Sequence, residues 1–219
     1  MKMRRKWIEI AIWSLLLGQL ALSVYLYPRL PDPLPTHWNM RGEVDGYMSK
    51  PLGVGFPLAL NLGIYLLLVS LPALDPKAKI EKFQQVLDMV RLFIHGLLTV
   101  IFVIALLNSL GYAIPVDKTV PALISLLFIF LGNYLGKLRP NYFIGIRTPW
   151  TLENEQVWQK THRVSGPVWM GAGLVGLIGS FRGGAIAFGF FFGALMAATA
   201  FSLWYSWKVY QDLKGSDKH

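Results

Sequence analysis

The sequence predicts an all-α membrane protein with six transmembrane helices, an extracellular polar loop and a cytoplasmic interfacial helix. Three observations support that fold class. Hydrophobic residues make up 54% of the 219 residues and charged residues only 15%, whereas a soluble domain usually carries about 25% charged residues. Apolar runs of membrane-spanning length recur along the chain. Lysine and arginine gather in alternate connecting segments, as they do in multi-pass membrane proteins.

Composition also excludes several classes of function. The chain has no cysteine, so disulfides, thiolate metal sites and cysteine nucleophiles are excluded. Its net charge is +9, but the basic residues form short clusters between apolar runs, so we expect no direct binding to nucleic acid. No catalytic triad, glycine-rich phosphate loop or metalloprotease pattern stands out. We therefore expect neither an enzyme nor a bound cofactor.

The first expected span covers residues 7–27. It follows the basic N-terminus MKMRRKW and exceeds the apolar core of a secretory signal, which has about 7–15 residues. We therefore expect this span to be retained. The other five expected spans cover residues 51–72, 92–112, 119–136, 166–181 and 185–207.

Residues 28–50 form the external polar loop, PRLPDPLPTHWNMRGEVDGYMSK. Its prolines favour an extended path, and two short segments around Gly42 and Gly46 carry turn signals. Three interpretations stay open. The loop is a recognition surface built on Trp38, Asn39 and Tyr47, a metal site from His37, Glu43 and Asp45, or a compact loop whose aromatics anchor at the bilayer surface. The metal spacing matches no strong zinc or calcium signature, so we expect no metal.

Polar residues inside the expected spans are expected to pair between helices, because polar groups in lipid usually turn inward. We expect His95 to lie near Asn133. The alternative is a small transporter or lipid-handling protein in which these groups line a path. These residues are Gln19, Asn61, His95, Asn108 and Asn133.

The fourth span leads into a second polar segment, residues 132–163, GNYLGKLRPNYFIGIRTPWTLENEQVWQKTHR. Pro140 disfavours a helical residue before it, so the helix should stop by Arg139. Thr148 or Thr151 can then cap an interfacial amphipathic helix over about 152–163. Arg147 beside that helix start can bind an anion or carboxylate, or it can pair with a lipid phosphate or Glu153. Both interpretations stay open, as does a membrane enzyme that uses Glu153, Glu155 or His162.

The last two spans should form a tight antiparallel hairpin. Gly166-Pro167 predicts a break before the fifth span, because proline is tolerated in the first turn of a helix. Only Arg182-Gly183-Gly184 joins the two spans. Both carry small residues at every fourth position, which lets helix backbones approach closely in lipid. These residues are Ala172, Gly176 and Ser180 in the fifth span, and Ala185, Gly189, Gly193 and Ala197 in the sixth.

The basic residues orient the protein, because lysine and arginine accumulate in cytoplasmic segments. With the N-terminus inside, sixteen of them are cytoplasmic and five are external. The sixteen are Lys2, Arg4, Arg5, Lys6, Lys77, Lys79, Lys82, Arg91, Lys137, Arg139, Arg147, Lys160, Arg163, Lys208, Lys214 and Lys218, and the five are Arg29, Arg41, Lys50, Lys118 and Arg182. We therefore expect both termini and the 132–163 segment in the cytosol.

Both polar segments resemble known sequences. LPTHWNMRGEVDGY at 34–47 resembles the short N-terminal domain of unknown function that recurs in bacterial membrane proteins of the SdpI type. The whole 132–163 segment resembles the SdpI family signature. We therefore expect two units: residues 1–72, with two spans and the 28–50 loop, and residues 73–219, an SdpI-like unit with four spans and the 132–163 signature.

The resemblance implies a bacterial immunity and signalling protein of the cytoplasmic membrane. Such a protein protects against a secreted, membrane-active killing peptide, and it draws a repressor to the membrane when the peptide is present. Its expected partners are membrane lipids, an extracellular toxin peptide and a cytoplasmic repressor protein.

Site residues follow from the same resemblance and from the two polar segments. The expected recognition residues are His37, Trp38, Asn39, Gly42 and Asp45. The expected signalling residues are Asn141, Gly145, Arg147, Thr148, Trp150, Thr151 and Trp158. The external loop would engage the peptide, and the resulting change would be read in the cytosolic segment.

Overall fold

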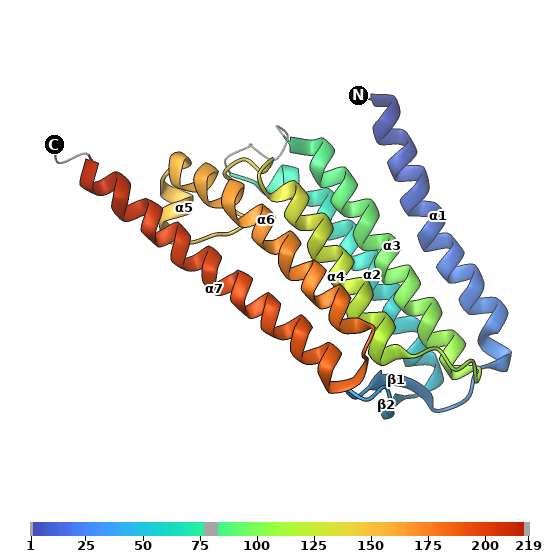
Figure 1. Cartoon of the computed structure of the whole chain (residues 1–219). Helices are drawn as coiled ribbons and strands as arrows, with labels where there is room; N and C mark the ends of the chain where they lie inside the picture. The colour runs from blue at the N-terminus through green and yellow to red at the C-terminus, as the bar shows by residue number, and fades with distance from the viewer. Residues whose placement is uncertain (1, 77–82, 217–219) are drawn as a thin grey trace.

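Long helices lying side by side form most of the molecule (Figure 1). The computed structural model describes residues 2–76 and 83–216. Lys77, Lys79, Lys82 and Lys218, which contribute to the predicted orientation, lie outside the described residues. The long helices are α1 (Lys2–Leu26), α2 (Lys50–Leu74), α3 (Gln84–Ser109), α4 (Val116–Leu135), α6 (Glu155–Ser180) and α7 (Gly184–Ser216).

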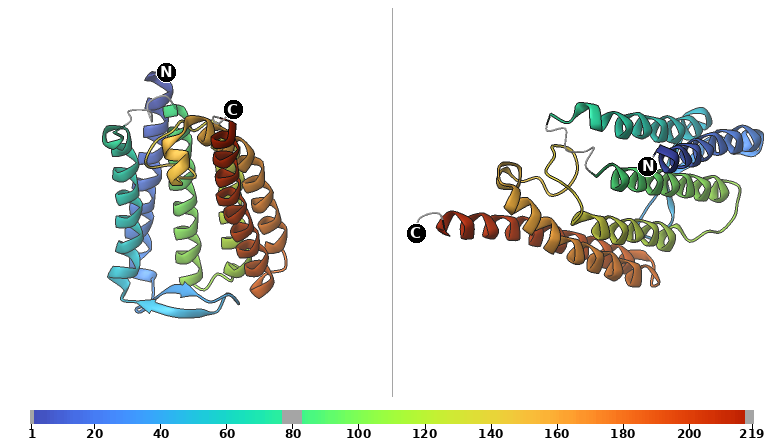
Figure 2. Two further views of the ribbon diagram at one scale, coloured as in Figure 1. Left: turned by 90° about the vertical axis from the view of Figure 1, so that its left-hand side faces the viewer. Right: turned by 90° about the horizontal axis from the view of Figure 1, so that it is seen from above.

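The protein is a multi-pass membrane protein. Within the described residues, five helices are long and apolar enough to cross a bilayer: α1, α2, α3, α4 and α7. The helix α6 has 26 residues, but its polar first half and its glycines lower its hydropathy. It lies between α4 and α7 in the bundle (Figures 1 and 2). Six full crossings therefore stay a prediction, and five are supported by length and composition.

Both termini lie at one end of the bundle, and the connection between α1 and α2 lies at the other (Figures 1 and 2). We call these the terminal end and the hairpin end. The 136–154 segment lies at the terminal end, so the two polar segments of the sequence are on opposite sides of the bundle. That separation agrees with the predicted topology. The assignment of the terminal end to the cytosol stays a prediction.

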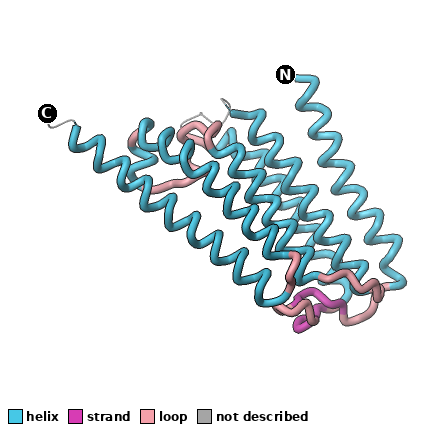
Figure 3. Tube along the Cα trace, in the orientation of Figure 1, coloured by secondary structure: helices cyan, strands magenta, loops and turns pink. Residues whose placement is uncertain are grey.

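The all-α expectation missed a small β-sheet at the hairpin end (Figure 3). After a short 3-10 helix, η1 (Tyr27–Arg29), strand β1 (Leu34–Trp38) pairs antiparallel with β2 (Val44–Met48). The hairpin is held down by Leu34, which is 3% exposed and packs on Gly53 at the start of α2. The prolines suggested only an extended path, because a two-stranded sheet gains stability from packing on helices that are distant in sequence.

The expected break at Gly166-Pro167 is wrong. The helix α6 continues through Pro167, and the preceding polar residues belong to it. The capped segment is instead a separate short helix, α5 (Pro149–Glu153), and Asn154 caps α6. Proline is tolerated inside membrane helices when neighbouring groups support the freed backbone. Here Gly166 packs directly against the α4 backbone, so tertiary packing supports the helix where local propensity favoured a break.

The tight turn between α6 and α7 is confirmed. The helix α6 ends at Ser180 and α7 begins at Gly184, with φ values of 69° and 57° at Gly183 and Gly184. Gly189 and Gly193 of the α7 stripe do not make the helix contact, since nothing lies within 4 Å of a Cβ built at either position. With Ala197 they line an open apolar groove beside α6.

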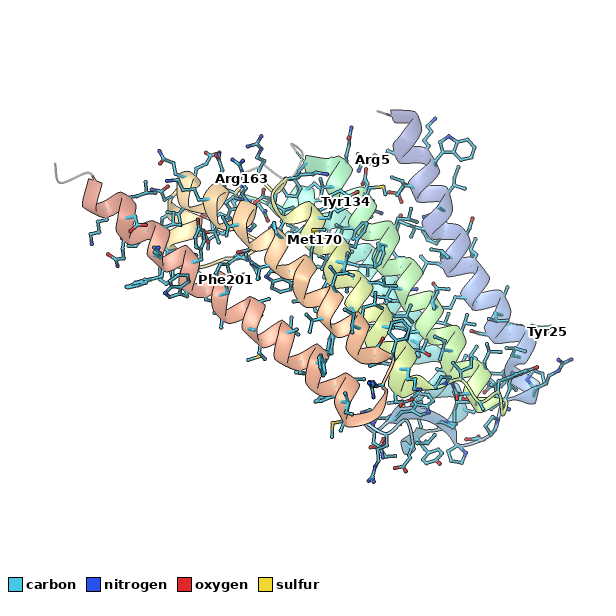
Figure 4. The ribbon with its side chains drawn as sticks, viewed as in Figure 1. Arg5, Tyr25, Tyr134, Arg163, Met170 and Phe201 are labelled. Atoms are coloured by element: carbon cyan, nitrogen blue, oxygen red, sulfur yellow. The ribbon has the colours of Figure 1, made fainter. Side chains whose placement is uncertain are left out.

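Glycines bring the backbones of α4 and α6 into close contact. A Cβ built on Gly132 would lie 2.7 Å from the carbonyl oxygen of Gly166 and 2.7 Å from the amide nitrogen of Met170. One built on Gly173 would lie 2.7 Å from the carbonyl oxygen of Ser125. Figure 4 labels Met170 on the α6 side of this contact. Backbone atoms cannot move aside as a flexible side chain can, so these positions require glycine.

Gly132→Ala is expected to lower the free energy of unfolding by about 1–3 kcal/mol, because overpacking forces the two backbones apart. Gly171→Ala is the matched control, since a Cβ at Gly171 meets nothing within 4 Å. Thermal unfolding of both variants in the same detergent measures the difference. Equal unfolding temperatures for the two variants would contradict the inferred contact.

Candidate functional site

The turn of the β-hairpin is built around Asn39. Its Oδ1 accepts hydrogen bonds from the backbone amides of Arg41 at 2.8 Å and Glu43 at 3.1 Å, and its Nδ2 donates to the Glu43 carboxylate. Gly42 has a φ of 78°, and a Cβ there would lie 3.3 Å from the side chain of Asp117 on α4. Asn39 and Gly42, expected as recognition residues, therefore shape the turn and seat it on α4.

A groove at the hairpin end brings together the other predicted recognition residues. We call it the hairpin groove; its volume is about 430 Å³. The hairpin, the start of α4 and the start of α7 line it, through His37, Trp38, Asn39, Met40, Asp45, Val116, Asp117, Val120, Pro121, Gly184 and Phe188. His37 Nδ1 contacts the carboxylate of Asp45 across the strands. Asp117 accepts a hydrogen bond from the Gly184 amide at 2.9 Å, which joins α4 to α7 at the groove.

The arrangement of His37, Glu43 and Asp45 does not favour metal binding. Glu43 bonds to Asn39 and lies 3.5 Å from the Arg41 guanidinium, whereas His37 contacts Asp45. Within residues 2–76 and 83–216, no three His, Cys, Asp or Glu side chains form a group that could hold an ion. His37 and Asp45 therefore meet, whereas Glu43 is engaged with Asn39 and Arg41.

Asn141 organises the loop between α4 and α5. It is fully buried, and its Oδ1 accepts hydrogen bonds from the backbone amides of Phe143 and Ile144, both at 2.8 Å. Its Nδ2 donates to the carbonyls of Arg139 at 2.9 Å and Ile144 at 3.0 Å. This amide uses both its donor and acceptor groups within the loop. Its role is to fix the loop backbone.

His162 and Trp158 hold the other side of that loop. Their rings stack 4.0 Å apart. The amide of Ile146 donates to His162 Nε2 at 2.9 Å, and Nδ1 donates to the carbonyl of Trp158 at 2.9 Å, so the neutral tautomer carries its proton on Nδ1. Gly145, with a φ of 118°, lies against both rings. A side chain there would overlap the imidazole.

The ring of His162 stays neutral at physiological pH. It precedes the apolar part of α6 and lies at the terminal end of the bundle, where Figure 4 labels the next residue, Arg163. Burial lowers the pKa of His162 from 6.5 to about 4, against a smaller opposing effect of its hydrogen bond to Trp158. Protonation would also place an N–H against the donating amide of Ile146. His162 therefore acts as a structural anchor for the loop.

The helix α5 starts with the predicted cap. Thr148 and Thr151 form a capping box, in which each side chain accepts from the other residue's backbone amide. Trp150 donates from Nε1 to Ser206 Oγ on α7 at 2.8 Å, which ties α5 to the last helix. Arg147 is exposed and donates to the carbonyl of Tyr142. Among the predicted signalling residues, Arg147 keeps a charged group available to a partner.

Comparison with known proteins shows what the two polar segments are similar to. Residues 137–206 match the model of the SdpI/YfhL protein family, and residues 14–60 match a domain of unknown function, DUF1648. Over residues 137–206 the chain is similar to the SdpI/YfhL protein family. The immunity protein SdpI of Bacillus subtilis (strain 168) is 27% identical over 197 residues, covering 89% of this chain and 91% of that protein. No solved structure matches the chain.

The hairpin groove lies where the two matched regions of the chain meet. Trp38 and Asp45 come from the DUF1648 match, whereas Gly184 and Phe188 come from the SdpI/YfhL match. Residues 116–121 of α4, between the two matches, complete the groove. The groove therefore forms only when the two matched regions pack against each other.

A buried polar network joins α1, α2 and α3. The Asn61 amide donates to Gln19 Oε1 at 2.8 Å, and His95 Nδ1 donates to Asn61 Oδ1 at 2.7 Å. The interhelical pairing expected for these three residues is confirmed. The expected neighbour of His95 was wrong, since Asn133 is exposed on α4.

The sequence reasoning missed the ion pair next to that network. Arg91, which is 1% exposed, donates to both carboxylate oxygens of Glu9, at 2.7 Å and 3.2 Å. Asp88 lies 3.4 Å from the same guanidinium, and the Tyr65 hydroxyl donates to Glu9 at 3.0 Å. The available signal was the charge itself: Glu9 lies just inside the first apolar run, and charges there are usually paired.

Proposed function

We propose that this protein confers immunity against a membrane-active killing peptide and signals the presence of that peptide to a cytoplasmic repressor. The support for immunity is the family and the name of its Bacillus subtilis relative. The signalling part follows from the division of the polar residues between the two ends of the bundle. We further propose that the hairpin end faces outward.

The hairpin groove is the observation that carries the proposal. It is large enough for several side chains, and it brings Trp38 and Asp45 of the hairpin together with Asp117 of α4. Trp38 is half-buried and offers an aromatic surface. The two carboxylates favour a cationic group, since complementary charge steers and orients binding partners. A cationic, amphipathic peptide arriving at the outer surface would meet this groove first.

The helix α7 provides a physical connection from this groove to the other end. The backbone amide of Gly184, the first residue of α7, donates a hydrogen bond to Asp117 at the groove. Near the other end of α7, Ser206 accepts a hydrogen bond from Trp150 of α5. A displacement of α7 by the bound peptide would reach the loop that carries Arg147. Exposed arginine suits a carboxylate on a partner protein, because the guanidinium can form two parallel hydrogen bonds.

Expression in a peptide-sensitive host tests the immunity. A Bacillus subtilis strain 168 derivative without its own SdpI would carry the protein and be exposed to medium conditioned by the parent strain. We expect the wild-type protein to raise survival, and the paired substitution H37A/D45A to lower survival at least about tenfold, because both side chains line the groove. R41A is the matched control, since Arg41 is exposed on the same hairpin but does not line the groove. Absence of protection by correctly inserted wild-type protein would refute the immunity proposal.

The same strains test signalling when they carry a reporter controlled by the promoter of the gene for this protein and its associated repressor. We expect R147A to keep the protection and to lose the peptide-dependent rise of the reporter. K160A on α6 provides the control, as an exposed cation of the same end. A normal peptide-dependent rise of the reporter in R147A would show that Arg147 is not needed for signalling.

A further inference from the structure

A second cavity lies beneath the hairpin, between α2 and α3. We call it the α2–α3 cavity; its volume is about 270 Å³. Its lining is apolar apart from Thr36 in the hairpin and Asn61 in α2, and Leu98, Phe102 and Ala105 of α3 form its opposite wall. Phe56 and Leu60 of α2 also line it, and they are 57% and 45% exposed. The cavity therefore borders the surface that faces the bilayer.

Asn61 gives this apolar cavity a specific polar group. It is 1% exposed and is held in place by Gln19 and His95 on the two neighbouring helices. An asparagine amide has two N–H donors and a carbonyl with two lone pairs. Among the described residues, one N–H and one lone pair of Asn61 are used. A donor and an acceptor remain for a group that enters the cavity.

Trp38 connects this cavity with the hairpin groove, because its side chain lines both. We propose that the α2–α3 cavity binds an apolar segment of the killing peptide, with Asn61 hydrogen-bonding a peptide group of that segment. This inference rests on the proposed function and adds a second part to its binding site. The groove would hold the polar part of the peptide, and the cavity the apolar part.

The polar group in the cavity favours a peptide over a lipid acyl chain. Eight residues of helix separate Gly53, beneath the hairpin, from Asn61, a rise of about 12 Å along the axis. An acyl chain that reached this depth would present only methylene and methyl groups to the amide. A peptide segment would present a carbonyl and an N–H, each of which costs several kcal/mol when it is left unpaired in the hydrocarbon region. Asn61 can pair with both.

Filling the cavity tests the inference. Ala105→Phe places a ring in the cavity without removing a polar group, and Asn61→Leu removes the amide. Val100→Phe on the same helix is the matched control, since Val100 is 44% exposed and does not line the cavity. Survival in conditioned medium is the first readout. The second is native mass spectrometry of the purified proteins in detergent, incubated with the peptide fraction of that medium.

We expect wild-type and Val100→Phe protein to protect cells and retain the peptide, and Ala105→Phe to lose both properties. Asn61→Leu should weaken peptide retention about tenfold, which is the effect of one lost hydrogen bond. Thermal unfolding checks that Ala105→Phe is folded, and Ala105→Leu replaces it if it is not. Protection by Ala105→Phe equal to that of Val100→Phe would overturn the inference and leave the immunity proposal standing.

Two further outcomes are informative. A phospholipid retained by the wild-type protein and displaced in Ala105→Phe, with unchanged protection, would make the cavity a lipid site and overturn the peptide assignment. If the wild-type protein binds the peptide in the cavity but protects no cells, the immunity proposal fails and the binding site is supported. The two proposals can therefore fail separately.

Discussion

Arg91→Met is expected to lower the free energy of unfolding by about 3–5 kcal/mol, the cost of removing one partner from a buried ion pair. Arg91 neutralises two carboxylates at once, Glu9 at 2.7 Å and Asp88 at 3.4 Å. Its guanidinium also lies 5.4 Å from the centre of the Tyr65 ring. The substitution leaves two negative groups close together, with little water to separate them.

Arg163→Met serves as the control, because Arg163 is exposed on α6 and an exposed charge contributes little. A double variant isolates the mechanism. Glu9→Gln in the Arg91→Met background should recover part of the lost stability, since it removes one of the uncompensated charges. Denaturant titrations in detergent measure the wild-type protein, Arg91→Met, Glu9→Gln, the double variant and the Arg163→Met control. Simple addition of the two single effects would show that charge compensation is not the cause.

The same ion pair has a consequence for α1. Glu9 of α1 pairs with Arg91 on α3. The helix α1 also meets the bundle through the Gln19–Asn61 hydrogen bond and an apolar stripe that includes Ile8, Ile12 and Leu16. In lipid the hydrophobic effect does not drive helices together, so packing and polar pairs must do so. Loss of Arg91 should therefore loosen α1 before it unfolds the rest.

Trp158→Ala is the second large expected effect, a loss of about 3–5 kcal/mol in unfolding free energy. The indole is fully buried and contacts the loop at the terminal end at Leu138 and Gly145. Its Nε1 donates to the carbonyl of Leu138 at 3.0 Å, its ring stacks on His162, and a Cβ built on Gly145 would lie 3.2 Å from it. Truncation to alanine leaves a cavity, and it also leaves the Leu138 carbonyl without its indole donor.

Two comparisons separate these contributions. Trp158→Phe keeps most of the ring but loses the N–H donor, so it should cost about 0.5–1.5 kcal/mol through the hydrogen bond, plus a packing loss. Trp204→Ala, at a position on α7 that is 51% exposed, should change stability little. Hydrogen exchange of the 136–148 backbone gives a local readout, and Trp158→Ala should raise it strongly. Protection equal to that of Trp204→Ala would mean that Trp158 does not hold the loop.

Most of the motif residues in the two polar segments hold the local backbone in place. Nearly all the residues that resemble the family signatures have structural roles: Asn39 and Gly42 form a turn, Asn141 fixes a loop, and Thr148 caps a helix. These residue types indicated turns and helix caps in the local backbone. They did not reveal which side chains remain available to a partner, because that depends on what the rest of the bundle covers.

Hydropathy and residue type by themselves determined the class of this protein, the approximate position of its long helices, a helix cap at Thr148 or Thr151 and the turn at Gly183-Gly184. These features depend on local interactions, such as the burial of apolar side chains in lipid or the torsion angles of single residues. Tertiary structure decided the rest: the β-hairpin seated on α2, the continuity of α6 through Pro167, the Glu9–Arg91 pair across 82 residues, and the Gln19–Asn61–His95 network. Each requires contacts between residues far apart in sequence. The energy of such contacts depends on helix packing, which no local pattern encodes.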